Sequence, residues 1–120
     1  MVVDGREDGD SAVQPLSLDA VLEILSNYQR RAILHHLIDA PGHLHSLDEL
    51  IAHLSRVETQ RNGEPPGEDY LLSVLVHIHG PKLQQAGLID YDVRSGEVRY
   101  HPHERVERLL EQIESTAEKW

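Results

Sequence analysis

Residues 69–101 read DYLLSVLVHIHGPKLQQAGLIDYDVRSGEVRYH, and this stretch decides the fold. Its first half predicts a helix over residues 69–86 that ends at Gly87, because glycine readily adopts the left-handed conformation that closes helices. Residues 88–92 and 97–101 have strand-like composition, and Gly96 lies in the turn between them. The helix is expected to bury an apolar stripe made of Leu72, Leu75, Val76, Ile78 and Leu83.

Three helices are predicted upstream of this stretch. Ser17 is a suitable N-cap for the first helix, and a second helix is predicted over residues 28–39. Residues 43–45 are long enough only for a very short strand, and Ser46 with Glu49 forms the capping box of a third helix. The inward positions of the first helix are expected to be Leu18, Val21, Leu22 and Leu25.

The segment RVETQRNGEPPG (residues 56–67) predicts a loop, although its first residues could continue the third helix. An ordinary helix-turn-helix has a turn of about three or four residues, so either the third helix is long or the turn is expanded. The predicted fold class is mainly α with a small β-hairpin. We expect a winged helix-turn-helix over residues 16–102, followed by an amphipathic helix over residues 103–120 and preceded by a disordered acidic segment over residues 1–15.

The charge balance is strongly acidic, and it bears on any nucleic-acid partner. In this chain of 120 residues, 21 Asp and Glu oppose 11 Lys and Arg, so the formal net charge is −10 and a basic footprint is missing. The absence of Cys excludes disulfides, thiolate zinc sites and cysteine nucleophiles. No apolar run is long enough to cross a bilayer, so we expect one soluble, cytoplasmic domain.

The acidic composition also suggests a host environment. Only Lys82 and Lys119 are lysines and no Phe is present, which is typical of proteins from a salt-rich cytoplasm. At molar salt the electrostatic screening length falls to about 3 Å, so repulsion between this chain and DNA would be nearly erased. We therefore expect a halophilic host; the alternative is that the acidity serves solvation alone.

Candidate DNA contacts fall in three places. The helix over residues 69–86 offers Lys82, Gln84 and Gln85, where lysine can contact phosphate or guanine and glutamine can pair with adenine. Arg94 and Arg99 lie in the hairpin, although nearby carboxylates could neutralise both. At the start of the second helix, Arg30 and Arg31 could reach phosphate or form a structural ion pair.

The last helix carries a narrow apolar stripe close to heptad spacing. Such a seam commonly packs on a second copy of itself, which predicts a homodimer, but it could equally pack on the first helix of the same chain. The candidate dimerisation residues are Val106, Leu109, Leu110, Ile113 and Trp120.

Neither a metal site nor an enzyme is expected. The nine His include three H-x-H pairs, at residues 43/45, 77/79 and 101/103, but residues two apart on a helix point in roughly opposite directions. No phosphate-binding glycine loop and no hydrolase or metalloprotease motif occurs, so no catalytic residue and no cofactor is predicted.

Three segments of the chain read LSLDAVLEILSNYQRRAILHHL, HSLDELIAHLSRVE and HIHGPKLQQAGLIDYD. Together they resemble an abundant haloarchaeal winged-helix family of unknown function, and the resemblance runs from Leu16 to about His101, with Gly80 where a Leu is usual. It implies a winged helix-turn-helix that regulates transcription by binding DNA. The alternative is a winged helix that binds a protein partner through its terminal helix or the Tyr91 and Tyr100 face of its hairpin.

Overall fold

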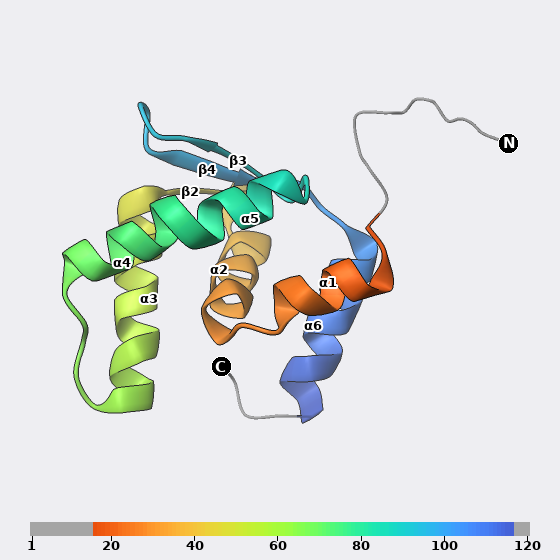
Figure 1. The fold of residues 1–120 in the computed structure, drawn as a ribbon, viewed down its shortest axis with the longest axis horizontal. Helices are drawn as coiled ribbons and strands as arrows, with labels where there is room; N and C mark the ends of the chain where they lie inside the picture. Colours follow the sequence, from red (N-terminus) through yellow and green to blue (C-terminus); the bar gives the residue numbers. More distant parts are fainter. Residues whose placement is uncertain (1–15, 117–120) are drawn as a thin grey trace, which may run out of the picture.

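The computed structural model describes residues 16–116, so the predicted disorder of residues 1–15 lies outside the described residues. Figure 1 shows the helices and strands in chain order. The order is α1 (Leu18–Leu25), α2 (Tyr28–Asp39), a 3-10 turn (Pro41–His43), β2 (Leu44–Ser46), α3 (Leu47–Asn62), α4 (Glu68–Val74), a π-helical turn (Leu75–His79), α5 (Gly80–Gln85), β3 (Ile89–Asp92), β4 (Glu97–Tyr100) and α6 (Glu104–Thr116).

Side-chain caps fix where the helices of the first half begin. The Ser17 hydroxyl accepts a hydrogen bond from the backbone N–H of Ala20, and this begins α1. The predicted capping box of α3 is confirmed: the Ser46 hydroxyl accepts from the Glu49 N–H at 3.1 Å, and the Glu49 carboxylate accepts from the Ser46 N–H at 3.0 Å. These short polar contacts form in the places that the sequence indicates.

Helix α3 is longer than the sequence analysis predicted. It continues to Asn62 and ends at Gly63, which adopts the left-handed conformation at φ 89°. The loop prediction is therefore wrong for residues 56–62, where Val57 and Glu58 are buried and hold the helix against the core. Of the two alternatives, the long helix is the one observed, and residues 63–67 join α3 to α4.

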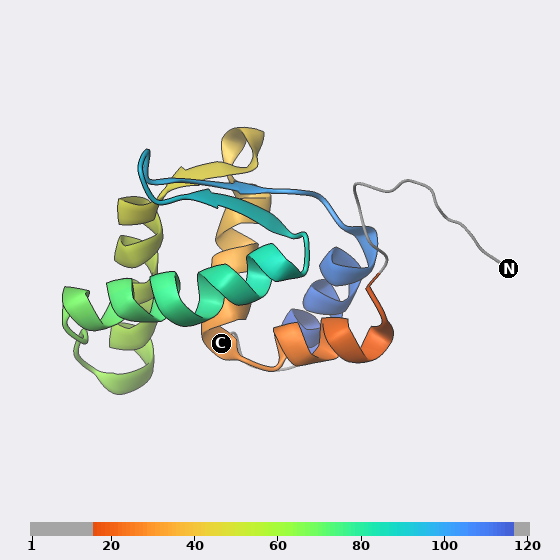
Figure 2. The same cartoon turned by 45° about the horizontal axis from the view of Figure 1, so that its top comes forward.

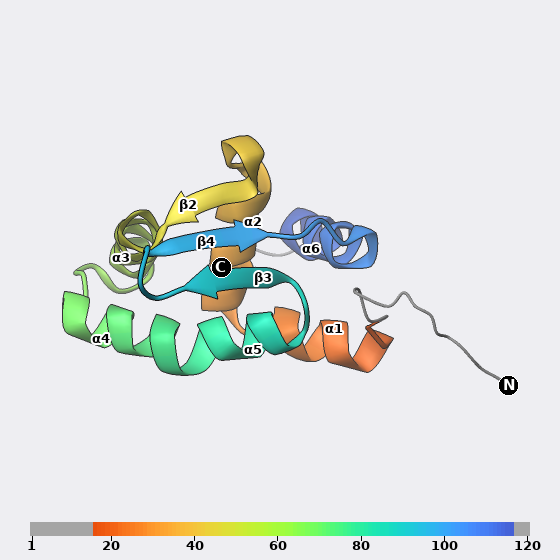
Figure 3. The same cartoon turned by 90° about the horizontal axis from the view of Figure 1, so that it is seen from above.

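The strands form one antiparallel sheet in the order β2-β4-β3 (Figure 3). The short strand near residues 43–45 is therefore present, one residue later than predicted, and it pairs with β4 so that Leu44 faces Arg99. Val98 and Tyr100 are buried on the inner face of β4. Buried and exposed residues alternate along this strand, as expected for a strand that is covered on one face. Figure 2 shows this sheet above the helices.

The chain is thus mainly helical with a small antiparallel sheet, an arrangement compatible with a winged-helix-like fold. Helices α2 and α3 pack together beneath the sheet, and the helix that contains α4 and α5 runs beside β3 (Figure 3). A single apolar cluster joins these elements and includes Leu34, Leu54, Leu83 and Tyr100. The fold class predicted from the sequence is confirmed.

Helix α6 packs against α1 of the same chain, at the end of the molecule opposite α4 (Figure 1). Val106 and Leu110 are buried in the common core, and Leu109 and Ile113 are partly buried against it. The prediction that this stripe forms an exposed dimer seam is therefore wrong for Val106 and Leu110. Their partner is α1, which was the other alternative, and Trp120 lies outside the described residues.

Candidate nucleic-acid interface

Segments α4, the π-helical turn and α5 follow one another without a break, and residues 68–85 are called the composite helix below. Pro81 has no N–H and its ring disfavours ordinary helical geometry one turn earlier. The chain responds with a wider turn, in which the Gly80 N–H donates to the Leu75 carbonyl oxygen five residues before it. A Cβ atom at position 80 would lie 2.6 Å from that oxygen, so this turn requires glycine.

The composite helix buries a different face from the one that the sequence predicted. Leu71, Val74, Leu75 and Leu83 are buried, whereas Leu72 is 39% exposed and Ile78 is 53% exposed. The predicted inward positions of Leu72 and Ile78 are therefore wrong. A π-helical turn adds one residue to the helix, and a stripe drawn with a single helical period cannot follow the buried face across it.

The three candidate DNA contacts on this helix differ in their surroundings. Gln84 and Gln85 are exposed, and both belong to the last turn of α5. Lys82 is partly buried, and its ammonium group donates to the Glu23 carboxylate on α1 at 2.8 Å. This contact lowers the pKa of Glu23. Lys82 is the only Lys or Arg of the composite helix, so the one formal positive charge of this helix is already paired with the Glu23 carboxylate.

The paired arginines at the start of α2 stabilise the end of α1. Arg30 is buried, and its guanidinium donates to the carbonyl oxygens of Ile24 at 2.8 Å and Glu23 at 3.0 Å. Arg31 donates to the Leu25 carbonyl oxygen at 2.7 Å. Carbonyls at a helix C-terminus lack partners within the helix, and a cation there also complements the helix dipole. Because Arg30 is buried, the expectation that it contacts phosphate is wrong. Arg31 is only partly buried.

A buried polar chain links the composite helix to α2 and α3. The Arg30 Nη1 donates to His79 Nδ1 at 3.4 Å, which places the His79 proton on Nε2, 2.9 Å from the Gln29 side-chain oxygen. The Gln29 amide in turn donates to the Glu58 carboxylate, which also accepts from the Tyr28 hydroxyl. Burial, and then the nearby Arg30 charge, lower the pKa of His79 to about 4. His79 is therefore a neutral connector inside the fold.

The hairpin places its two arginines differently. Arg94 is exposed in the turn between β3 and β4, where its backbone N–H donates to the Asp92 carboxylate. Arg99 is exposed on the outer face of the sheet, directly across from Asp90 on β3. Cross-strand carboxylates weaken the attraction of an arginine for phosphate. Arg94 is consequently the better placed of the two for an external anion.

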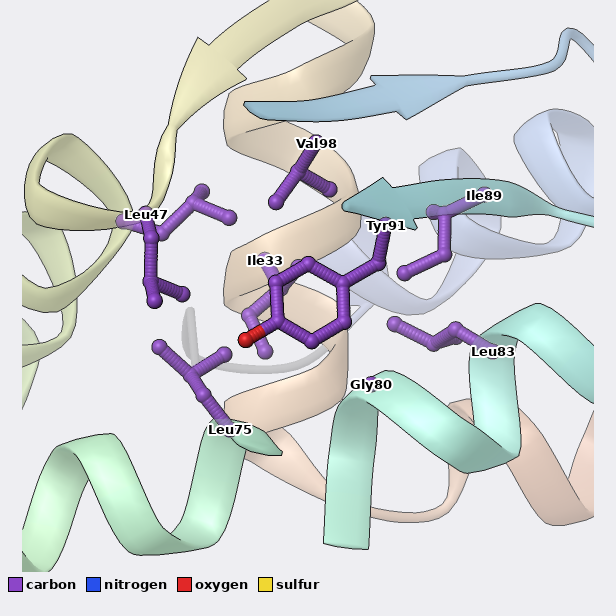
Figure 4. A pocket seen from close by; sticks show the side chains of 9 residues that line it. Ile33, Leu47, Leu75, Gly80, Leu83, Ile89, Tyr91 and Val98 are labelled. Carbon is purple, nitrogen blue, oxygen red and sulfur yellow. The ribbon is translucent and has the colours of Figure 1, made fainter. Parts of the chain in front are cut away.

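A small cavity lies between the composite helix and the inner face of the sheet (Figure 4). Its volume is about 10 Å³, and its lining is apolar except for the Tyr91 hydroxyl, which is buried and has no hydrogen-bond partner among residues 16–116. A cavity of about that volume holds at most one water molecule. This space is therefore a packing defect rather than a binding pocket.

Three histidine rings stack on one another where α2, β2 and α3 meet. The His36 ring stacks on His45 with a centroid separation of 4.2 Å and on His53 with a separation of 4.0 Å, joining α2, β2 and α3. Burial lowers the pKa of His53 to about 4, so this ring stays neutral in the stack near neutral pH. Within residues 16–116, no group of three His, Cys, Asp or Glu is arranged to hold a metal ion.

The fold and this surface define a small, mainly helical domain with a hairpin beside an accessible helix. Residues 22–99 match the family model described as Domain of unknown function (DUF7344), and the chain therefore belongs to that family. No curated protein and no solved structure matches the chain. Across the part of the chain that the structure describes, no helix is long and apolar enough to cross a membrane.

Sequence reasoning missed three exposed apolar side chains on the composite helix, which are Tyr70, Leu72 and Ile78. The signal was present in the Gly80-Pro81 pair, because a proline one turn into a continuing helix often accompanies a π-helical turn or a kink. It also missed Glu23 as the partner of Lys82. No sequence signal could have found that contact, since the two residues lie 59 positions apart and meet only through the tertiary fold.

Proposed function

We propose that the protein is a winged-helix transcription regulator that places the composite helix in the major groove of DNA. The observation that carries the proposal is the exposure of Gln84 and Gln85 on this helix, next to a hairpin with an exposed Arg94 at its turn. A helix fits the major groove, and a hairpin beside it can reach the adjacent backbone or minor groove. Neither a catalytic step nor a cofactor is part of the proposal.

The chemistry of the exposed face indicates how such a protein would read DNA. A glutamine amide can bind adenine through two hydrogen bonds, and apolar side chains such as Leu72 and Ile78 can contact thymine methyl groups. With Lys82 paired to Glu23 and a net charge of −10, counterion release would contribute little affinity. Base contacts and DNA shape would therefore dominate, which fits our further proposal of a salt-rich cytoplasm, as in a halophilic archaeon.

Selection from a random DNA library, together with gel shifts on the DNA upstream of the gene, tests this proposal at low and at molar KCl. Gln84→Ala should weaken binding to the selected site by about 1–3 kcal/mol and relax the sequence preference at one position. Arg94→Ala should weaken binding to all sequences alike and reduce the salt dependence. Arg56→Ala is the matched control, because this exposed arginine lies on α3 near His36 and His53 of the histidine stack.

Failure to select any sequence at any salt concentration would remove the DNA proposal. Equal losses for Arg94→Ala and Arg56→Ala would show that binding depends on charge in general and not on the hairpin turn. Retention of a sequence preference by the double variant Gln84→Ala, Gln85→Ala would exclude the proposed contact surface.

A second candidate function is protein binding through the composite helix, favoured by the exposure of Tyr70 (56%), Leu72 and Ile78. The surfaces that the sequence suggested for a partner are partly covered, because Tyr100 is buried with its hydroxyl donating to Glu107 and one side of α6 packs on α1. Purification from the native cells discriminates the two functions. A stoichiometric protein that is lost with Ile78→Glu would support this candidate, whereas nucleic acid without such a protein would exclude it.

A further inference from the structure

Helix α1 presents two leucines to solvent. Leu18 is 50% exposed and Leu22 is 44% exposed, although the sequence pattern predicted both as inward positions. The buried side of α1 is formed by Val21, Ile24 and Leu25, which pack into the core. Because Leu18 and Leu22 are four residues apart on a helix, they lie one above the other and form one apolar ridge.

A groove lies beside this ridge, between α1 and the start of α6. It has a volume of about 450 Å³ and is lined by Leu18, Glu104, Arg105, Arg108 and Leu109. Leu18 and Leu109 form the apolar part of this lining, and Glu104, Arg105 and Arg108 form its charged part. An apolar ridge beside a partly apolar groove is a surface that can fit a second copy of itself.

The charges around this surface have a matching arrangement. Asp19 is exposed on α1 next to the ridge, while Arg105 and Arg108 are exposed across the groove on α6. Arg108 is paired with Glu104 at 2.7 Å. Within residues 16–116, Arg105 donates only to the Leu16 carbonyl oxygen, at 3.4 Å, so Arg105 is the better placed of the two for an acidic group of a second copy. A chain with a net charge of −10 generally repels its own copies, so a self-contact needs a local region where opposite charges meet. A two-fold axis between the ridge and the groove brings the acidic edge of each α1 toward the arginine side of the other copy's groove.

We propose that a second copy of this chain docks on the ridge and groove, which we call the α1–α6 face (Leu18, Asp19, Leu22, Arg105, Arg108 and Leu109). In the resulting symmetric dimer, the ridge of each copy enters the groove of the other. Helices α1 and α6 lie side by side at the end of the molecule away from α4, so the dimer contact lies away from the α4 end of the composite helix (Figures 1 and 3). This inference does not depend on DNA binding.

The size of the face determines the expected strength. Stable interfaces bury about 800 Å² and involve about 20–30 residues on each partner, and the α1–α6 face comprises far fewer residues than that. The dimer is therefore expected to form reversibly and to dissociate on dilution. A two-fold contact also repeats every residue, so one substitution in the chain removes two contacts from the dimer.

Sedimentation velocity without DNA tests the proposal over a wide range of protein concentration, in dilute buffer and in molar KCl. The wild-type protein should shift from monomer to dimer, and Leu22→Glu should raise the dissociation constant by at least roughly tenfold. Asp19→Arg should weaken association in dilute buffer and have less effect in molar KCl. Leu72→Glu is the matched control, because this leucine has similar exposure on the composite helix, away from the α1–α6 face.

Circular dichroism of each variant establishes that the substituted chains remain folded, which is expected because all three positions are exposed. A monomer at every concentration and salt would overturn the proposal. So would a dimer that Leu72→Glu disrupts and Leu22→Glu does not, since the composite helix would then be the contact. If Leu22→Glu fails to fold, Asp19→Arg alone decides, and an unchanged dissociation constant in dilute buffer would count against the α1–α6 face.

Discussion

Acidification is expected to destabilise this fold through His79. Its pKa falls from the ordinary value of 6.5 to about 4 because the ring is buried beside the Arg30 guanidinium. The unfolded chain therefore binds a proton at a pH where the folded chain does not, and the stability contribution is complete above about pH 6.5. It is lost as the pH falls from 6.5 toward 4, and at about 1.4 kcal/mol for each pH unit the loss is about 3 kcal/mol.

Urea unfolding of the wild-type protein and of His79→Gln, followed by circular dichroism, measures this loss. The variant should lack about 3 kcal/mol of the wild-type decrease between pH 7 and pH 4, because glutamine can keep a hydrogen bond to Gln29 but cannot be protonated. Other acid-sensitive groups, His53 among them, remain in both proteins and cancel in the comparison. Parallel pH profiles, or an NMR titration that places the His79 pKa near 6.5, would refute the reasoning.

Two further predictions concern the backbone of the same region. Gly80→Ala should lower the free energy of unfolding by about 1–3 kcal/mol, because its Cβ would meet the Leu75 oxygen. Gly67→Ala, where a Cβ meets nothing within 4 Å, should cost less than about 1 kcal/mol, so equal losses in urea unfolding would contradict the π-helical turn. Arg30→Met should cost about 3–5 kcal/mol and Arg31→Met about half as much, because Arg30 satisfies two carbonyls and His79 while Arg31 satisfies one carbonyl. Similar urea midpoints for the two arginine variants would show that the buried contacts of Arg30 contribute nothing extra.

The parts of the fold that sequence could predict are those that depend on neighbouring residues. The Ser46 and Glu49 capping box, the stop at Gly87 and the hairpin turn at Gly96 all form within a few residues, and the structure has each of them. The paired strands followed from alternating apolar residues such as Val98 and Tyr100. Local chemistry therefore predicted most of the secondary structure and the fold class.

The parts that sequence could not predict depend on contacts between distant segments. Leu18 and Leu22 fit an inward stripe by spacing alone, but the position of α6 leaves them in solvent. Arginine side chains usually lie at the surface, yet the fold buries Arg30 against His79, 49 residues away. The candidate site was predicted only as a region, because the availability of each polar side chain is set by tertiary neighbours.

The π-helical turn has a consequence for which sequence changes the protein can accept. Each residue advances an α-helix by about 100°, so deleting one residue from Leu75–His79 would rotate α5 by that angle relative to α4. Gln84 and Gln85 would swing away from their present side, and Leu83 would leave the core. Within this family, lengths between the two glycines at positions 67 and 87 should therefore be kept constant even where the residues between them change.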